Sequence, residues 1–133
     1  MKKQRYTYLN DGFEGVLYEA ENKDDRLLIV IQGLKGLELP EKYAELFSGR
    51  GDSVLAMTYY GAPGQPDQMR AIPLEMFQTA VDRMKEYGDG RFKHFGMYGN
   101  SKGAGMALLA ASVVPDISLV IVASSFGHIT VSY

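Results

Sequence analysis

Strand-length apolar runs alternate with helix-length segments along most of this chain. The apolar runs cover residues 26–31, 53–60, 92–98 and 117–123, and the intervening segments predict helices over 40–48, 73–88 and 103–114. Strands joined by helices of this length run parallel, because the crossover returns the chain to the end of the sheet where the previous strand began. The pattern predicts an α/β fold with a mostly parallel sheet, wound right-handed and flanked by helices.

The first twenty residues predict a different element. Residues 5–21 alternate loosely between apolar and polar side chains around a turn at 10–12, which indicates an antiparallel hairpin ahead of the parallel strands. The run 26–31 is apolar on both faces, as in a strand buried in the middle of a parallel sheet. A chain of 133 residues is expected to form one domain, residues 1–133.

Composition excludes several classes of function. The 14 basic and 16 acidic side chains nearly balance, so the chain has no basic surface predicted for nucleic acid. No apolar run approaches the roughly 18 residues of a spanning helix, and the start does not resemble a signal peptide, so we expect a cytoplasmic protein with no membrane partner. The chain has no cysteine and only two histidines, which argues against disulfides, cysteine-ligated zinc, thiol catalysis and a histidine-rich metal site. We expect no metal and no cofactor.

The segment with the clearest chemistry is G-x-S-x-G at residues 99–103, with Ser101 at its centre. It follows the strand 92–98 directly and opens the helix at Gly103, as a nucleophile elbow does: a tight turn that lifts a serine hydroxyl above the sheet. We therefore predict that Ser101 is a nucleophile with φ and ψ outside the common regions. An ordinary glycine-containing turn is the alternative. A phosphate-binding loop fits less well, because Ser101 precedes the lysine and the glycine.

A nucleophilic serine needs donors for the oxyanion of its intermediate. In this type of fold, one donor is the backbone N–H after the serine, here Lys102, and the other comes from the loop after an early central strand. That loop is residues 33–36, and its position predicts the N–H of Leu34 as the second donor. A plain glycine-rich turn is the alternative for the loop. Tyr59 and Tyr60 end the next strand, where neighbours point to opposite faces, so one is expected in the core while the other can line an acyl pocket.

Three stretches together resemble the C-terminal catalytic domain of the acyl-CoA thioester hydrolase and bile acid-CoA:amino acid N-acyltransferase family. This family is a branch of the α/β-hydrolases close to dienelactone hydrolase. Residues 59–66 running into 72–77 are similar to its Y-x-G-x-P-G-x-P and I-P-L-E-Y-F signatures, residues 99–108 to G-x-S-K-G-A-E-x-A-L, and residues 33–38 more loosely to its oxyanion loop. The resemblance runs from about residue 11 to 126. Gly105 departs from it, since an acidic residue is usual there, and the family's N-terminal β-sandwich is absent.

The resemblance implies an acyl hydrolase that acts on a small-molecule acyl thioester or ester. Serine at position 101 favours hydrolysis, because the amide-forming transferases of the family use cysteine. The family's acid and histidine lie on later strands, so the resemblance also implies a partial domain that lacks about the last two-fifths of the fold, including its C-terminal strands.

The chain offers few partners for Ser101. Asp116 precedes the strand 117–123 and is expected to be a helix-to-strand loop residue rather than a triad acid. His94 begins a strand, at the opposite edge from the serine. His128 follows the last strand on the correct edge; we expect a structural role for it, and a role as the base for Ser101 is the alternative.

Three functions follow as hypotheses. The first is a serine acyl hydrolase of the acyl-CoA thioesterase type. The alternatives are a catalytically incomplete relative that acts as a binding or assembly module, and an acyl-CoA N-acyltransferase. If later strands are missing, the strand 117–123 is left at an open edge, and we expect a homo-oligomer.

Overall fold

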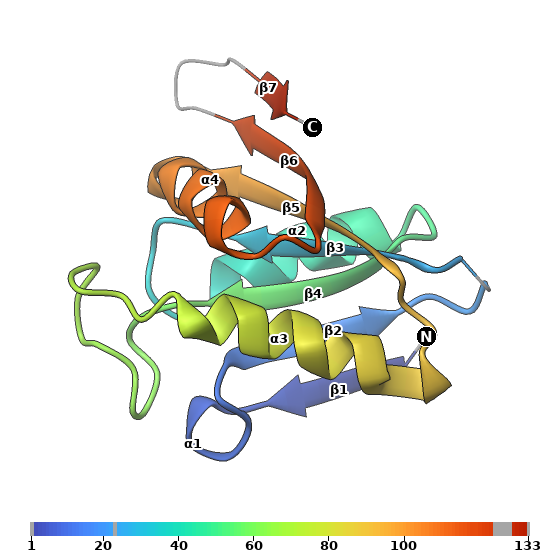
Figure 1. Cartoon of the computed structure of the whole chain (residues 1–133), viewed down its shortest axis with the longest axis horizontal. Helices are drawn as coiled ribbons and strands as arrows, with labels where there is room; N and C mark the ends of the chain where they lie inside the picture. The colour runs from blue at the N-terminus through green and yellow to red at the C-terminus, as the bar shows by residue number, and fades with distance from the viewer. Residues whose placement is uncertain (1, 23, 124–128, 133) are drawn as a thin grey trace.

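The computed structural model describes residues 2–22, 24–123 and 129–132, and its centre is one seven-stranded sheet (Figure 1). The spatial order of the strands is β1-β2-β4-β3-β5-β6-β7. The strands are β1 (Lys2–Tyr6), β2 (Glu14–Glu19), β3 (Arg26–Ile31), β4 (Ser53–Thr58), β5 (His94–Asn100), β6 (Ile117–Ala123) and β7 (Ile129–Ser132). The helices are α1 (Tyr8–Asp11), α2 (Glu38–Ser48), α3 (Glu75–Glu86), the 3-10 helix η1 (Tyr87–Asp89) and α4 (Lys102–Val113).

The middle of the sheet is parallel and its flanks are antiparallel. Strands β4, β3, β5 and β6 pair in parallel, while β2 pairs antiparallel with β4 and with β1. The predicted α/β architecture and the predicted hairpin are both confirmed. The hairpin connection is the one-turn helix α1 rather than a tight turn at residues 10–12, and Gly12 ends this helix with φ of 83°.

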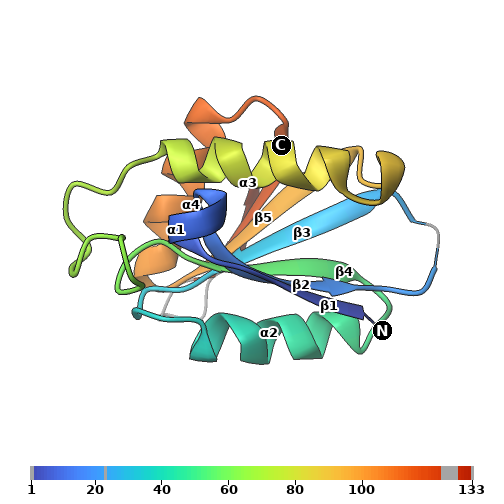
Figure 2. The same cartoon turned by 90° about the horizontal axis from the view of Figure 1, so that it is seen from below.

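Helices cover both faces of the sheet. Helix α2 lies against one face and helices α3 and α4 lie against the other (Figure 2). Alternation along β3 shows the two-sided burial: Ile29 packs in the cluster that contains Phe77 of α3 and Ala107 of α4, whereas Val30 packs with Ala44 of α2. A strand buried on both faces has no polar side to display, which explains its continuous apolar sequence. In the described part of the chain, no helix has the length and apolarity needed to cross a bilayer.

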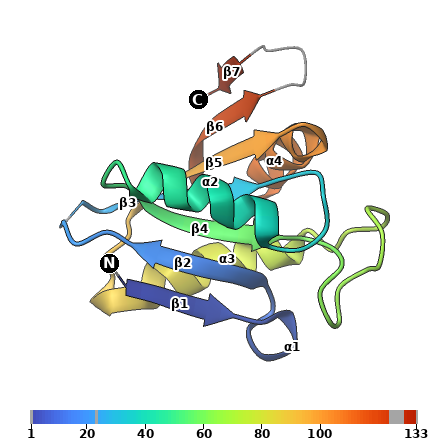
Figure 3. The ribbon, with the colours of Figure 1, turned by 180° about the vertical axis from the view of Figure 1, so that it is seen from behind.

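The structure corrects two boundaries and one edge of the sheet. Strand β5 occupies residues 94–100 rather than 92–98, and α2 begins at Glu38, ahead of Pro40. The expectation that β6 is an open edge strand is wrong, because β7 pairs with it antiparallel from Val120 to Ala123. Strand β7 is short and no helix-length segment separates it from β6, so the alternation of strands and helices does not predict it. The outermost strands are β1 and β7, at opposite sides of the sheet (Figure 3).

Candidate active site

Ser101 is the single residue between β5 and α4, and its backbone is strained. It has φ of 58° and ψ of −126°, outside the regions that residues with a side chain ordinarily adopt, and it is exposed. Two backbone hydrogen bonds hold the turn: the Ser101 N–H donates to the Ala123 carbonyl (2.9 Å), and the Ala104 N–H donates to the Ser101 carbonyl (3.0 Å). The predicted strand-to-helix turn, with an unusual backbone at the serine, is confirmed.

The glycines on either side of Ser101 are required by close packing. A Cβ atom on Gly99 would lie 2.3 Å from the carbonyl oxygen of Gly103 and 2.7 Å from the Cβ of Ala107. A Cβ atom on Gly103 would lie 2.9 Å from the carbonyl carbon of Gln32, at the end of β3. The start of α4 therefore sits directly on the ends of β5 and β3, which fixes the height and direction of Ser101 above the sheet.

The loop after β3 packs against the other side of the elbow. A Cβ atom on Gly33 would lie 2.8 Å from the Cβ of Lys102 and 3.1 Å from its backbone nitrogen. Within the described chain, the backbone N–H groups of Leu34 and Lys102 donate to no protein acceptor. The fold therefore brings the two predicted donor segments together beside Ser101.

The end of β4 holds this loop in place. The Tyr60 hydroxyl donates to the carbonyl oxygen of Gly33 (2.7 Å), and the Gly36 N–H donates to Oγ1 of Thr58 (3.1 Å). Tyr59 has the other role expected for the pair: its ring is 1 % exposed in the core, and burial raises the pKa of its hydroxyl. An acyl pocket is the role that the sequence suggests for the other tyrosine of the pair, Tyr60. Its contact with the loop could not be predicted, because nothing local in the sequence links residues 33 and 60.

Two further polar side chains lie at the ends of β3 and β5. The amide of Asn100, next to Ser101, donates to the Tyr43 hydroxyl of α2 (2.9 Å). Gln32 is 2 % exposed, and its Nε2 has no hydrogen-bond partner among the described residues. Neither side chain was predicted as part of the site. Their signal is a polar side chain at the carboxyl end of a buried parallel strand, where ligand sites of α/β folds lie.

The structure keeps two of the three considered partner residues away from Ser101. Asp116 lies before β6, where Lys85 of α3 donates to it (3.1 Å), and this contact holds the pKa of Asp116 below its ordinary value. It is a loop residue, as expected. His94 begins β5, at the opposite end from Ser101, and lies 3.7 Å from Asp25. His128 lies outside the described residues, so His94 is the only histidine in the described part of the chain.

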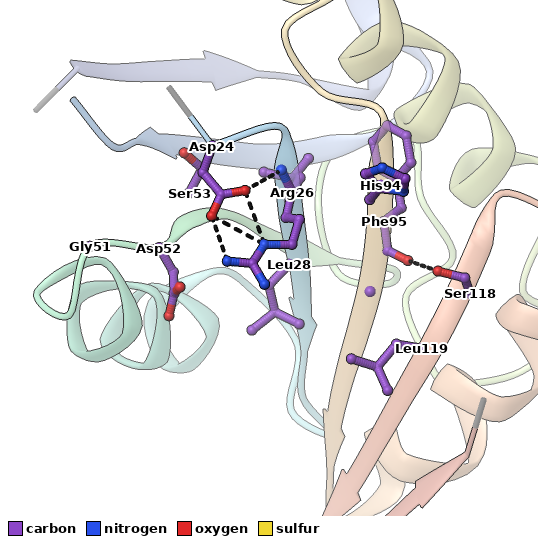
Figure 4. A pocket seen from close by; sticks show the side chains of 12 residues that line it. Asp24, Arg26, Leu28, Gly51, Asp52, Ser53, His94, Phe95, Ser118 and Leu119 are labelled. Atoms are coloured by element: carbon purple, nitrogen blue, oxygen red, sulfur yellow. Dashed lines mark hydrogen bonds and ion pairs between the residues drawn. The ribbon is translucent and has the colours of Figure 1, made fainter. Parts of the chain in front are cut away.

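A cavity of about 260 Å³ lies at the amino-terminal ends of the parallel strands (Figure 4). Its lining includes Leu28, Gly96 and Leu119, and at its rim the Arg26 side chain donates to the Asp24 carboxylate. These hydrogen bonds lower the pKa of Asp24 to about 2. The cavity is at the opposite edge of the sheet from Ser101, so it is not where an acyl group would meet the serine.

Part of the chain is similar in sequence to known acyl-CoA thioesterases. No protein-family model matches the chain. Over 84 residues the chain is 31 % identical to acyl-coenzyme A thioesterase 1 of Mus musculus, and this match covers 63 % of the chain and 20 % of the thioesterase. The chain thus spans about a fifth of the length of such relatives. The resemblance to acyl-CoA thioesterases drawn from the sequence motifs is confirmed over this part of the chain.

Solved structures identify the fold. The α/β hydrolase GrgF from Penicillium sp. sh18 matches 91 % of this chain over 44 % of its own length, with a TM-score of 0.65 and 22 % identity. The dienelactone hydrolase from Anabaena variabilis matches 92 % of this chain over 63 % of its own length, with a TM-score of 0.63 and 20 % identity. The chain has the α/β-hydrolase fold.

Proposed function

We propose that this chain carries the nucleophile and the oxyanion hole of a serine acyl hydrolase that acts on small-molecule acyl thioesters or esters. The observation that carries the proposal is the backbone of Ser101: an exposed serine with positive φ, held between a parallel strand and a helix start. Strain of this kind persists only where the surrounding structure maintains it, and it is concentrated at functional sites. The likeness to acyl-CoA thioesterases supports the substrate class.

In the proposed reaction, Ser101 acts as the nucleophile and the two backbone N–H groups stabilise the oxyanion. The Ser101 oxygen attacks the acyl carbonyl carbon and gives its proton to a base, and the carbonyl oxygen becomes an oxyanion. The N–H groups of Leu34 and Lys102 donate to that oxyanion, assisted by the positive end of the α4 dipole. The C–S or C–O bond then breaks, the thiol or alcohol departs with the proton, and water releases the acid from the acyl-serine. No metal or cofactor takes part in this scheme.

His128 is the base in this proposal. The chain has only one other histidine, His94, which lies at the far end of β5. A base is essential, since an unassisted serine hydroxyl is a weak nucleophile and loss of a triad member costs on the order of 10⁴–10⁶ in rate.

A second candidate is a catalytically incomplete hydrolase that serves as a binding or assembly module. The observation that favours it is the position of Asp116, which lies before β6, at the opposite ends of the strands from Ser101, and pairs with Lys85. An N-acyltransferase is a weaker candidate, because serine occupies the nucleophile position.

Turnover of p-nitrophenyl butyrate and of a short acyl-CoA by three proteins tests the proposal. We expect Ser101→Ala and His128→Ala each to abolish the turnover of the unmodified chain. Slow turnover that Ser101→Ala barely changes would identify the incomplete hydrolase, for which oxyanion binding alone leaves roughly 10³-fold acceleration over water. Rapid turnover that depends on Ser101 but not on His128 would keep the nucleophile and reject the base.

A further inference from the structure

We infer that Tyr60 is a positioning residue of the oxyanion hole, because its hydroxyl orients the peptide group that carries the Leu34 N–H. The carbonyl of Gly33 and the N–H of Leu34 belong to one trans peptide and point in opposite directions. The Tyr60 hydroxyl donates to that carbonyl at 2.7 Å. The hydrogen bond therefore turns the Leu34 N–H away from Tyr60. The inference rests on the proposed function.

The peptide needs such a support. Gly33 has no side chain to restrict its backbone, and the side chains of Leu34 and Lys35 are exposed. Among the described residues, the next anchor of the loop is the hydrogen bond from the Gly36 N–H to Thr58, three residues further on. Rotation of the Gly33–Leu34 peptide would exchange its two polar groups and present a carbonyl oxygen, instead of an N–H, to the developing negative charge. That exchange replaces attraction by repulsion.

Tyr60 is itself fixed by contacts with the core, so its hydroxyl can hold the loop in one orientation. Its ring packs on the buried ring of Tyr59, with centroids 5.5 Å apart, and its carbonyl oxygen accepts a hydrogen bond from Thr58 Oγ1 (3.1 Å). Gly61 follows with φ of 91°, and a Cβ atom there would lie 2.6 Å from the Lys35 Cβ. The turn after Tyr60 and the loop after β3 are thus in direct contact.

The matched pair Tyr60→Phe and Tyr59→Phe tests the inference, because each removes one hydroxyl from adjacent residues. The Tyr59 hydroxyl faces Met69 (3.9 Å to Sδ) and not the loop. The first measurement is by NMR on the ¹⁵N-labelled full chain without ligand. We expect Tyr60→Phe to change the Leu34 N–H residual dipolar coupling and to lower the ¹⁵N order parameter of Leu34, as expected for loss of a local support. Tyr59→Phe should leave both values unchanged.

The second measurement is the turnover of p-nitrophenyl butyrate by the same variants. Loss of a whole oxyanion donor costs about 10²–10³ in kcat, so partial misorientation in Tyr60→Phe should lower kcat about tenfold, with KM within about twofold. A general loss of structure would instead lower the Tm and affect both parameters.

The two measurements separate failure of the inference from failure of the proposed function. Absence of Ser101-dependent turnover in the unmodified chain would reject the hydrolase, and the NMR data would still decide whether Tyr60 orients the peptide. An unchanged Leu34 coupling and order parameter in Tyr60→Phe would overturn the inference whatever the activity, as would an unchanged kcat in an active enzyme.

Discussion

At the elbow, the space available for a Cβ atom decides whether a position must be glycine. Gly99 and Gly105 lie six residues apart, yet their surroundings are opposite. A Cβ atom at Gly99 would meet three atoms within 2.8 Å, whereas nothing lies within 4 Å of a Cβ atom at Gly105, on the exposed side of α4. The first glycine is required by packing. For the second, the structure gives no packing reason.

These surroundings predict opposite effects on stability. Gly99→Ala forces the start of α4 away from β5 and should lower the free energy of unfolding by about 2–4 kcal/mol. Gly105→Ala removes backbone freedom from the unfolded chain at a helical position and should raise it by about 0.5–1 kcal/mol. Urea unfolding followed by circular dichroism measures both. Equal stability of the two variants would contradict the close packing of the elbow.

At this scale the sequence predicts Ser101 and its strained backbone, because the requirement is local: a strand end, two glycines and a helix start. The roles of Leu34, Lys102 and His128 remain predictions. Tyr60 could not be assigned its contact in advance, since a hydrogen bond between residues 27 positions apart depends on the pairing of β3 with β4.

At the scale of elements, one polar cluster joins the hairpin to the segment before β5. Arg91 donates to Glu19 at the end of β2 and to the carbonyl of Asn22, and the Tyr87 hydroxyl of η1 also donates to Glu19 (2.8 Å). Both side chains of the ion pair are about 15 % exposed. Burial opposes ionisation of Glu19, but the hydrogen bonds from Tyr87 and Arg91 outweigh it, and the pKa of Glu19 is lowered.

A lowered carboxyl pKa makes stability depend on acid. The contribution of Glu19 is complete above its unfolded pKa of about 4.3 and is lost as the pH falls through the lower folded value. We expect Glu19→Gln to lower the free energy of unfolding at pH 7 by about 1–3 kcal/mol and to flatten the stability curve below about pH 4. Glu86→Gln, at the exposed end of α3, controls for the loss of one carboxylate. If the free energy of unfolding of Glu19→Gln fell as steeply below pH 4 as that of the unmodified chain, the role given to Glu19 would be contradicted.

The order of elements could be predicted because each parallel strand and its crossover carry a periodicity of their own. Strand β7 could not, because its place beside β6 depends on pairing between strands and not on a pattern within its four residues. The two-residue shift of β5 has a related cause: Lys93 and His94 both donate to the carbonyl of Asp25, so the register with β3, and not the apolar run, fixes where β5 begins.

At the scale of the whole molecule, the helices on the two faces of the sheet differ in the number of apolar side chains that they expose. On the α4 side, Leu108, Leu109 and Val113 are each 47–48 % exposed, and Lys102 is the only charged residue in the helix. A helix with several exposed apolar side chains and no charge beyond its first residue ordinarily lies against another surface. The expectation of self-association remains a prediction. Because β7 covers the edge of β6, this prediction now rests on the exposed face of α4.

Self-association through α4 predicts a specific response to charge. Sedimentation velocity on the full chain at tens of micromolar should show a dimer or a larger species, and Leu109→Lys should shift it to the monomer, because an ammonium group cannot be buried in an apolar contact without a partner. Leu46→Lys is the matched control: Leu46 is 59 % exposed and lies on α2, across the sheet, where a new charge should leave the association unchanged. A monomeric unmodified chain would reject the prediction, and equal dissociation by both variants would place the contact elsewhere than on α4.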